Sequence, residues 1–121
     1  MERLKNWNCA VVHVGVNCTD GAEAEKLAQF LLDCFGISPE RNSDASVFAG
    51  PMVELMKHGG RGRHGHLAIA TDDLPATRAY LESLGCAFDD SGNKYFEDGS
   101  LMLTYLEYDF AGFAIHLLQR S

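Results

Sequence analysis

The chain has 121 residues, of which 46% are hydrophobic and 22% are charged, the proportions of an ordinary globular domain. This length allows one compact domain, or two very small halves that share one core, and it excludes a barrel enzyme of about 250 residues. Seventeen Asp and Glu against ten Lys and Arg give a net charge of −7, which argues against nucleic acid as a partner because nucleic-acid binders present a basic surface.

No segment has the pattern of a membrane span or an export signal. No apolar stretch approaches the roughly 18–20 residues that cross a bilayer, and the start of the chain lacks the apolar run of a signal peptide. The four cysteines, Cys9, Cys18, Cys34 and Cys86, form no Cys-x-x-Cys pair and no dense framework. We therefore expect buried, reduced thiols in a cytoplasmic protein.

The first half of the chain predicts a strand, a helix and two further strands. Residues 10–17 alternate, with His13 on the face opposite Val12 and Val14. A helix follows, with Asp20 as N-cap and Gly36 as its stop. After an irregular piece at 37–44, we expect strands at 46–49 and 53–57.

The second half repeats this plan after a Gly-rich, cationic linker at 57–63. A strand at 64–70 carries His66 on the face opposite Leu67 and Ile69. Asp72 or Asp73 caps the next helix, which Gly85 ends. Three strands are expected at 86–88, 101–106 and 113–118.

Two repeat halves, 10–57 and 64–119, therefore form one domain. Near the end of each half a Gly is followed four residues later by a polar residue in the last strand, which is Glu54 in the first half and His116 in the second. The second half is longer, and we expect an insertion around 89–99. A half this small cannot bury a sheet face alone, which predicts one core shared by both halves.

Four ionisable residues share one predicted face of the sheet: His13, Glu54, His66 and His116. Such a group is costly on a concave face unless it is paired or bound to a cation. Three imidazoles and one carboxylate suit Zn, Ni, Co or Fe better than Mg or Ca. A lone histidine is more often a hydrogen-bonded structural residue, but four at repeat-related positions favour a metal site.

In its paired halves and in the His, Glu, His order of its polar positions, the chain resembles the vicinal oxygen chelate superfamily, which includes glyoxalase I, extradiol dioxygenases and the fosfomycin- and bleomycin-resistance proteins. The resemblance covers residues 11–119. Four blocks, 13–18, 48–57, 65–71 and 112–119, most closely resemble the glyoxalase-like domain appended to bacterial keto-hydroxyglutarate/keto-deoxy-phosphogluconate aldolases.

The resemblance implies an α+β fold of two βαβββ modules that form a cupped, mostly antiparallel sheet, with a divalent metal held by His13, Glu54, His66 and His116. It implies a lyase or isomerase that chelates two adjacent oxygens of a small acid or sugar phosphate, with Glu54 as the catalytic proton carrier. The chain departs from the glyoxalase pattern at His116, where that pattern has a second carboxylate, and this puts glyoxalase I activity in doubt.

Further residues are candidates for substrate contacts. Arg61 and Arg63 would clamp an anion, or belong to a solvated linker, and Asn17 and Tyr105 would line the cup, or be satisfied structural groups. The expected partner is a small anionic or oxygen-rich molecule, and exposed sheet edges predict a homodimer. The alternative function is a non-catalytic ligand-binding or accessory domain that serves an aldolase.

Overall fold

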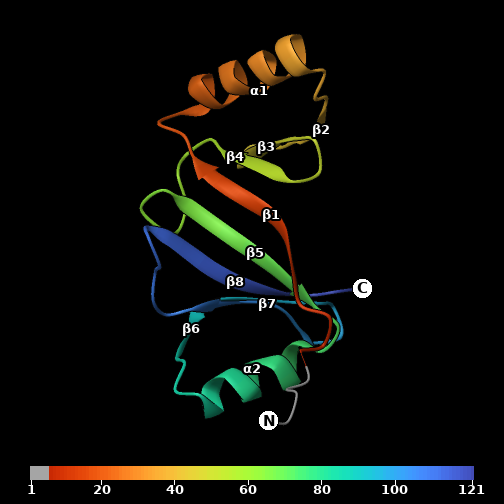
Figure 1. The fold of residues 1–121 in the computed structure, drawn as a ribbon, viewed down its shortest axis with the longest axis vertical. Helices are drawn as coiled ribbons and strands as arrows, with labels where there is room; N and C mark the ends of the chain where they lie inside the picture. The colour runs from red at the N-terminus through yellow and green to blue at the C-terminus, as the bar shows by residue number, and fades with distance from the viewer. Residues whose placement is uncertain (1–5) are drawn as a thin grey trace.

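The computed structural model describes residues 6–121, and in it one mixed eight-stranded sheet carries two helices (Figure 1). The elements follow in the order β1 (Ala10–Asn17), α1 (Gly21–Phe35), β2 (Pro39–Asn42), β3 (Ser46–Ala49), β4 (Val53–Met56), β5 (Gly65–Thr71), α2 (Leu74–Ser83), β6 (Phe88–Tyr95), β7 (Leu101–Leu106) and β8 (Phe113–Gln119). Only the β1–β4 and β5–β8 pairs are parallel. The predicted α+β class and mostly antiparallel sheet are confirmed.

The sheet is arranged symmetrically about its two central strands, β1 and β5, which pair with each other antiparallel. Outward from β1 come β4, β3 and β2, and outward from β5 come β8, β7 and β6. Each half thus follows the order first strand, fourth strand, third strand, second strand. The ends of the sheet are β2 and β6, so both edge strands belong to the middle of their own half.

Each helix begins at the residue that the sequence predicts. The Asp20 side chain accepts the backbone N–H of Glu23 at the start of α1, and Gly36 ends this helix with a left-handed φ of 69°. Asp73, not Asp72, caps α2 by accepting the N–H of Ala76. These local signals are strong because they satisfy backbone groups that a helix end leaves without partners.

The prediction of one shared core is wrong. The buried cluster under α1 contains only first-half residues, among them Ala24, Ala28 and Leu55. Leu74 and Leu117 are buried in the second half, whose helix α2 lies at the opposite end of the molecule in Figure 1. Two helices that far apart cannot meet over one sheet face, so the halves are joined through the β1–β5 pairing.

Both edge strands differ from the sequence-based expectation. The piece at 37–44 contains β2, all four of whose residues are exposed. The strand expected at 86–88 instead begins at Phe88 and continues to Tyr95 as β6, through the region assigned to an insertion. An edge strand has little apolar burial on either face, so it lacks the alternation by which strands are recognised.

The cysteine prediction is half right. All four cysteines are free thiols, but only Cys18 is buried, and Cys34 is exposed near the end of α1. No helix among residues 6–121 is long and apolar enough to cross a membrane. The prediction that the start of the chain lacks an export signal falls partly on residues 1–5, which lie outside the described residues.

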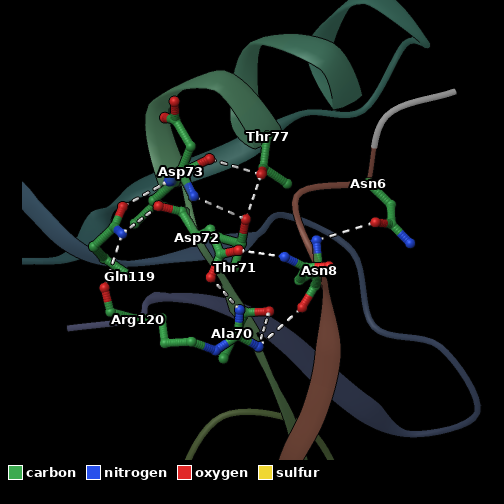
Figure 2. A network of polar contacts seen from close by, with 10 residues as sticks. Asn6, Asn8, Ala70, Thr71, Asp72, Asp73, Thr77, Gln119 and Arg120 are labelled. Atoms are coloured by element: carbon green, nitrogen blue, oxygen red, sulfur yellow. Dashed lines mark hydrogen bonds and ion pairs between the residues drawn. The ribbon is translucent and has the colours of Figure 1, made fainter.

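A polar network ties the end of the chain to the start of α2 (Figure 2). The Gln119 amide oxygen accepts the N–H of Leu74 at 2.7 Å, while its nitrogen donates to the Asp72 carbonyl at 2.8 Å. The Thr71 and Thr77 hydroxyls lie 2.7 Å apart in the buried part of this network. The last strand therefore positions the helix that covers its own half.

Candidate metal centre

The four predicted ligands line one cavity of about 370 Å³: His13 on β1, Glu54 on β4, His66 on β5 and His116 on β8. These are the four central strands of the sheet. The cavity wall also includes Arg41 of β2 and Lys94 of β6, so the sheet curls enough for both of its edges to meet the same space. This is the predicted cup.

Strand register brings the four side chains together. Gly15 of β1 is paired with Glu54 on one side and with His66 on the other, so these two residues flank a position that has no side chain. His13 and His116 are both paired with Ala68 of β5 and flank a second small residue in the same way. The large polar groups therefore converge over Gly15 and Ala68.

The side chains approach closely. Glu54 Oε1 lies 3.1 Å from His66 Nε2 and 3.4 Å from His13 Nε2, and the two imidazole nitrogens are 3.3 Å apart. One ring nitrogen from each of His13, His66 and His116 fits within a group whose atoms all lie within 4.8 Å of one another. Three imidazoles and a carboxylate thus surround one small space.

Glu54 is held as a carboxylate. Its burial would raise its pKa, but hydrogen bonds with His13, His66 and Ser46 outweigh burial and hold the pKa well below its usual range. The Ser46 hydroxyl donates to Glu54 Oε2 at 2.7 Å, which leaves Oε1 for the histidine side of the cup. The charge needed to balance a cation is therefore present at neutral pH.

Among the four predicted ligands, His116 is the one whose ring nitrogens have no hydrogen-bond partner within residues 6–121. It is 4% exposed, and neither of its buried ring nitrogens has a hydrogen bond. Burial, followed by repulsion from His66 and His13, lowers its pKa to about 3, so the ring is neutral and its one unprotonated nitrogen can donate an electron pair. An orphaned buried imidazole is costly unless something outside the chain binds it.

This donor set fits a divalent metal. Ligands of one ion lie about 2.0–2.2 Å from it and hence roughly 3–4 Å from each other, which is close to the separations found here. Imidazole nitrogen with one carboxylate suits Zn, Ni, Co or Fe. The three histidines form the group that could hold an ion, and Glu54 Oε1 lies within 3.4 Å of a ring nitrogen of two of them.

The predicted substrate residues separate into two groups. Tyr105 lines the cup, with its ring centroid 4.9 Å from that of His116, and burial raises its pKa so that its hydroxyl remains a donor. Arg61 stacks on the ring of Tyr105 and pairs with Asp89. Asn17 donates to the Gly62 carbonyl at 2.9 Å and so holds the linker, while Arg63 is exposed. Among these four, only Tyr105 contributes to the cavity wall.

The two cations that line the cavity, Arg41 and Lys94, were not identified from the sequence. Each lies on an edge strand that the sequence pattern did not predict with these bounds, and so neither could be assigned to a face. Phe48 was also missed; its ring lies edge-on to His13, with centroids 5.2 Å apart. No pattern in the sequence identifies these three residues. They are found only from the cross-strand register, which requires knowing the order of the strands in the sheet.

Comparisons with solved structures identify the architecture. The chain is similar to the methylmalonyl-CoA epimerase of Mycobacterium tuberculosis, with 18% identity and a TM-score of 0.63 over 100% of this chain and 93% of that one. A Streptomyces coelicolor methylmalonyl-CoA epimerase variant in complex with 2-nitronate-propionyl-CoA gives 18% identity and a TM-score of 0.62, covering 92% and 96%. The chain shares its glyoxalase-like fold with these structures.

A hypothetical protein from Bacillus halodurans has the same fold, with 14% identity and a TM-score of 0.64 over 94% of this chain and 96% of that one. No family profile and no curated protein sequence matches the chain. The likeness to these solved structures therefore shows the fold alone.

Proposed function

We propose that this protein binds one divalent metal ion through His13, Glu54, His66 and His116 and acts as a lyase or isomerase on a small oxygen-rich acid or sugar phosphate. The observation that carries the proposal is the unpartnered, buried His116 beside two further imidazoles and a carboxylate. A purely structural cluster would be expected to satisfy its buried polar atoms.

When bound, the metal would polarise two adjacent oxygens of the substrate and stabilise negative charge that develops on them. Glu54 would accept or deliver the proton, since it is the only Asp or Glu among the described residues that line the cavity. In the present arrangement its low pKa makes it a weak base. It becomes a stronger base when it loses its hydrogen bonds with the histidines, because those bonds stabilise the ionised form. The Tyr105 hydroxyl supplies a donor on the same wall.

The neighbouring epimerases are described in complex with 2-nitronate-propionyl-CoA and with methylmalonyl-CoA. A two-base epimerisation, which removes a proton from one face of a carbon and returns one to the other face, uses two proton carriers. In this cup one carboxylate faces three imidazoles, which favours a reaction with a single proton carrier. The second candidate is the non-catalytic one, a ligand-binding or accessory domain serving an aldolase. It would share the metal and the ligand but show no turnover.

The decisive experiment is metal analysis of protein purified without an affinity tag, followed by calorimetric titration of metal-free protein with Zn²⁺, Ni²⁺, Co²⁺ and Mg²⁺. We expect one ion of the first three per chain and weak binding of Mg²⁺. Glu54→Gln and His116→Leu should each weaken binding at least about tenfold, whereas His64→Gln, a control histidine outside the cup, should not. Stoichiometric metal binding that is retained in both Glu54→Gln and His116→Leu would overturn the proposed site.

Turnover distinguishes the enzyme from the accessory domain. The metal-loaded protein would be followed by NMR in deuterated water with 2-oxo acids, sugar phosphates, hemithioacetals and methylmalonyl-CoA. Deuterium incorporation or rearrangement that Glu54→Gln abolishes supports the enzyme. Saturable binding of these compounds with no exchange supports the accessory role.

We also propose that the protein forms a homodimer and works in the cytoplasm. The edge strands β2 and β6 each have one side unpaired in the single chain, and such edges are commonly covered in proteins. Four free thiols agree with a reducing compartment. Sedimentation at micromolar concentration should give a mass of two chains, and a monomer there would contradict the dimer.

A further inference from the structure

Two arginines stack on matching aromatic rings in the two halves. Arg41 lies over the Phe48 ring and Arg61 over the Tyr105 ring, each with its guanidinium carbon 4.3 Å from the ring centroid. The rings occupy equivalent positions, because Phe48 is paired with Glu54 across β3–β4 and Tyr105 with His116 across β7–β8. The pseudo-symmetric halves thus each place one guanidinium beside the cup.

In the second half the chain itself neutralises this guanidinium. Arg61 Nη1 lies 2.9 Å from Asp89 Oδ2, and Asp89 is the register partner of Tyr105 on β6. Gly92 leaves the space that the guanidinium fills, since a Cβ there would lie 2.5 Å from Arg61 Nη2. The charge of Arg61 is therefore balanced by Asp89, although its side chain is 36% exposed.

In the first half the corresponding carboxylate is missing. The register partner of Phe48 on β2 is Arg41 itself, where the second half has Asp89. Within residues 6–121, Arg41 makes no ion pair, and it lines the cavity that holds the metal-ligand residues. Stacking on Phe48 holds the guanidinium plane in place, which reduces the entropy lost when it binds an anion.

The charge of the cavity also favours the binding of an anion beside Arg41. Lys94 lines it from the opposite edge strand and also makes no ion pair within the described part of the chain. Glu54 is the single acidic residue on this wall, although the chain as a whole has a net charge of −7. A positive cup in an acidic protein attracts anionic ligands and keeps them oriented.

We propose that Arg41, with Lys94, binds a second anionic group of the substrate, at a distance from the two adjacent oxygens that approach the metal. The substrate class is then a small acid with a distal carboxylate or phosphate. Arg41 is a specificity-determining residue, because a planar guanidinium binds either group through two parallel hydrogen bonds. This inference rests on the proposed function for the adjacent oxygens, but the anion site itself needs no metal.

The test compares matched ligand pairs that differ only in the distal charge. The metal-loaded protein is titrated calorimetrically with 2-oxoglutarate and 2-oxopentanoate, which share a five-carbon chain, and with 3-phosphoglycerate and glycerate. We expect the member with the distal charge to bind at least about tenfold more tightly in one pair, as for one charge-assisted contact, and the favoured pair distinguishes carboxylate from phosphate. Arg41→Gln should reduce that preference to less than about twofold and leave unchanged the metal stoichiometry and the affinity of the member without the distal charge.

The matched control is Arg61→Gln/Asp89→Asn, which removes the equivalent guanidinium without changing the net charge and should retain the preference. No preference in the wild type, or a preference that survives Arg41→Gln, would overturn the anion site. Loss of the preference in the control would assign the anion to Arg61 instead. Absence of metal binding with the preference retained would overturn the proposed function and leave the anion site standing. Circular dichroism of each variant verifies that it is folded.

Discussion

Gly15 lies directly against the imidazole of His66. A Cβ at residue 15 would be 2.0 Å from Cε1 of that ring and 2.2 Å from its Nδ1, and the two residues are register partners across β1–β5. The ring of His66 therefore occupies the space of the missing side chain, and this is what brings its Nε2 to 3.1 Å from Glu54. The geometry of the proposed metal site therefore depends on Gly15, which has no side chain to supply a ligand atom.

Gly15→Ala is expected to displace the His66 ring and to weaken Zn²⁺ binding at least about tenfold, the effect of losing support for a ligand. The free energy of unfolding of the metal-free protein should fall by about 1–3 kcal/mol through overpacking. Gly21→Ala is the control, because a Cβ at position 21 meets nothing closer than 3.9 Å. Metal binding as tight as in the wild type would show that His66 is free to adopt its ligand position without the glycine.

His116→Leu is expected to stabilise the metal-free protein while it weakens metal binding. The change removes two buried ring nitrogens that have no hydrogen bond within residues 6–121, and leaving such a group unsatisfied costs about 1–3 kcal/mol. Urea unfolding with EDTA should therefore show a gain of that order, and added Zn²⁺ should stabilise the wild type more than the variant. A loss of stability in EDTA would mean that the imidazole contributes to the fold without a metal.

The Asp89 carboxyl should titrate far below the usual range of an aspartate. Hydrogen bonds from Ser91 and from Arg61 lower its pKa from 3.8 to about 2, so the Arg61–Asp89 pair persists at pH 4. Because the folded pKa is depressed, the contribution of this pair to stability is complete above pH 3.8 and is lost as the pH falls through 2. NMR of the carboxyl carbon measures the midpoint, which should rise in Arg61→Gln; an unchanged midpoint would contradict the neutralisation of Arg61.

Gln119→Leu is expected to destabilise the protein by about 1–3 kcal/mol, because the N–H of the fully buried Leu74 loses its acceptor. Hydrogen exchange should quicken in the first turn of α2. Arg120→Gln removes the exposed ion pair with Asp72 and the hydrogen bonds that Arg120 donates to the Asn8 and Ala70 carbonyls, and it should cost about 1 kcal/mol or less because these contacts are largely exposed. Equal effects of the two substitutions in chemical denaturation would mean that the amide of Gln119 does not position the helix.

The sequence alone determined the central part of this fold. Alternation in β1 and β5 placed His13 and His66 on the face away from the helices, and Asp20 and Gly36 marked the two ends of α1. The repeat related Glu54 to His116, and all four polar residues line one cavity. These signals are local or periodic, so they can be read without knowing which strands are neighbours.

Only the tertiary structure decided what surrounds those four residues. The edge strands β2 and β6 carry no apolar alternation, and the cations Arg41 and Lys94 that they bring to the cup had no predicted place. Arg61, expected as an anion clamp, is paired with Asp89, a residue 28 positions away in the chain. Pairing between strands and the curl of the sheet place such residues side by side. Cross-strand neighbours are fixed by the register between two strands, and the pattern along one strand contains no information on that register.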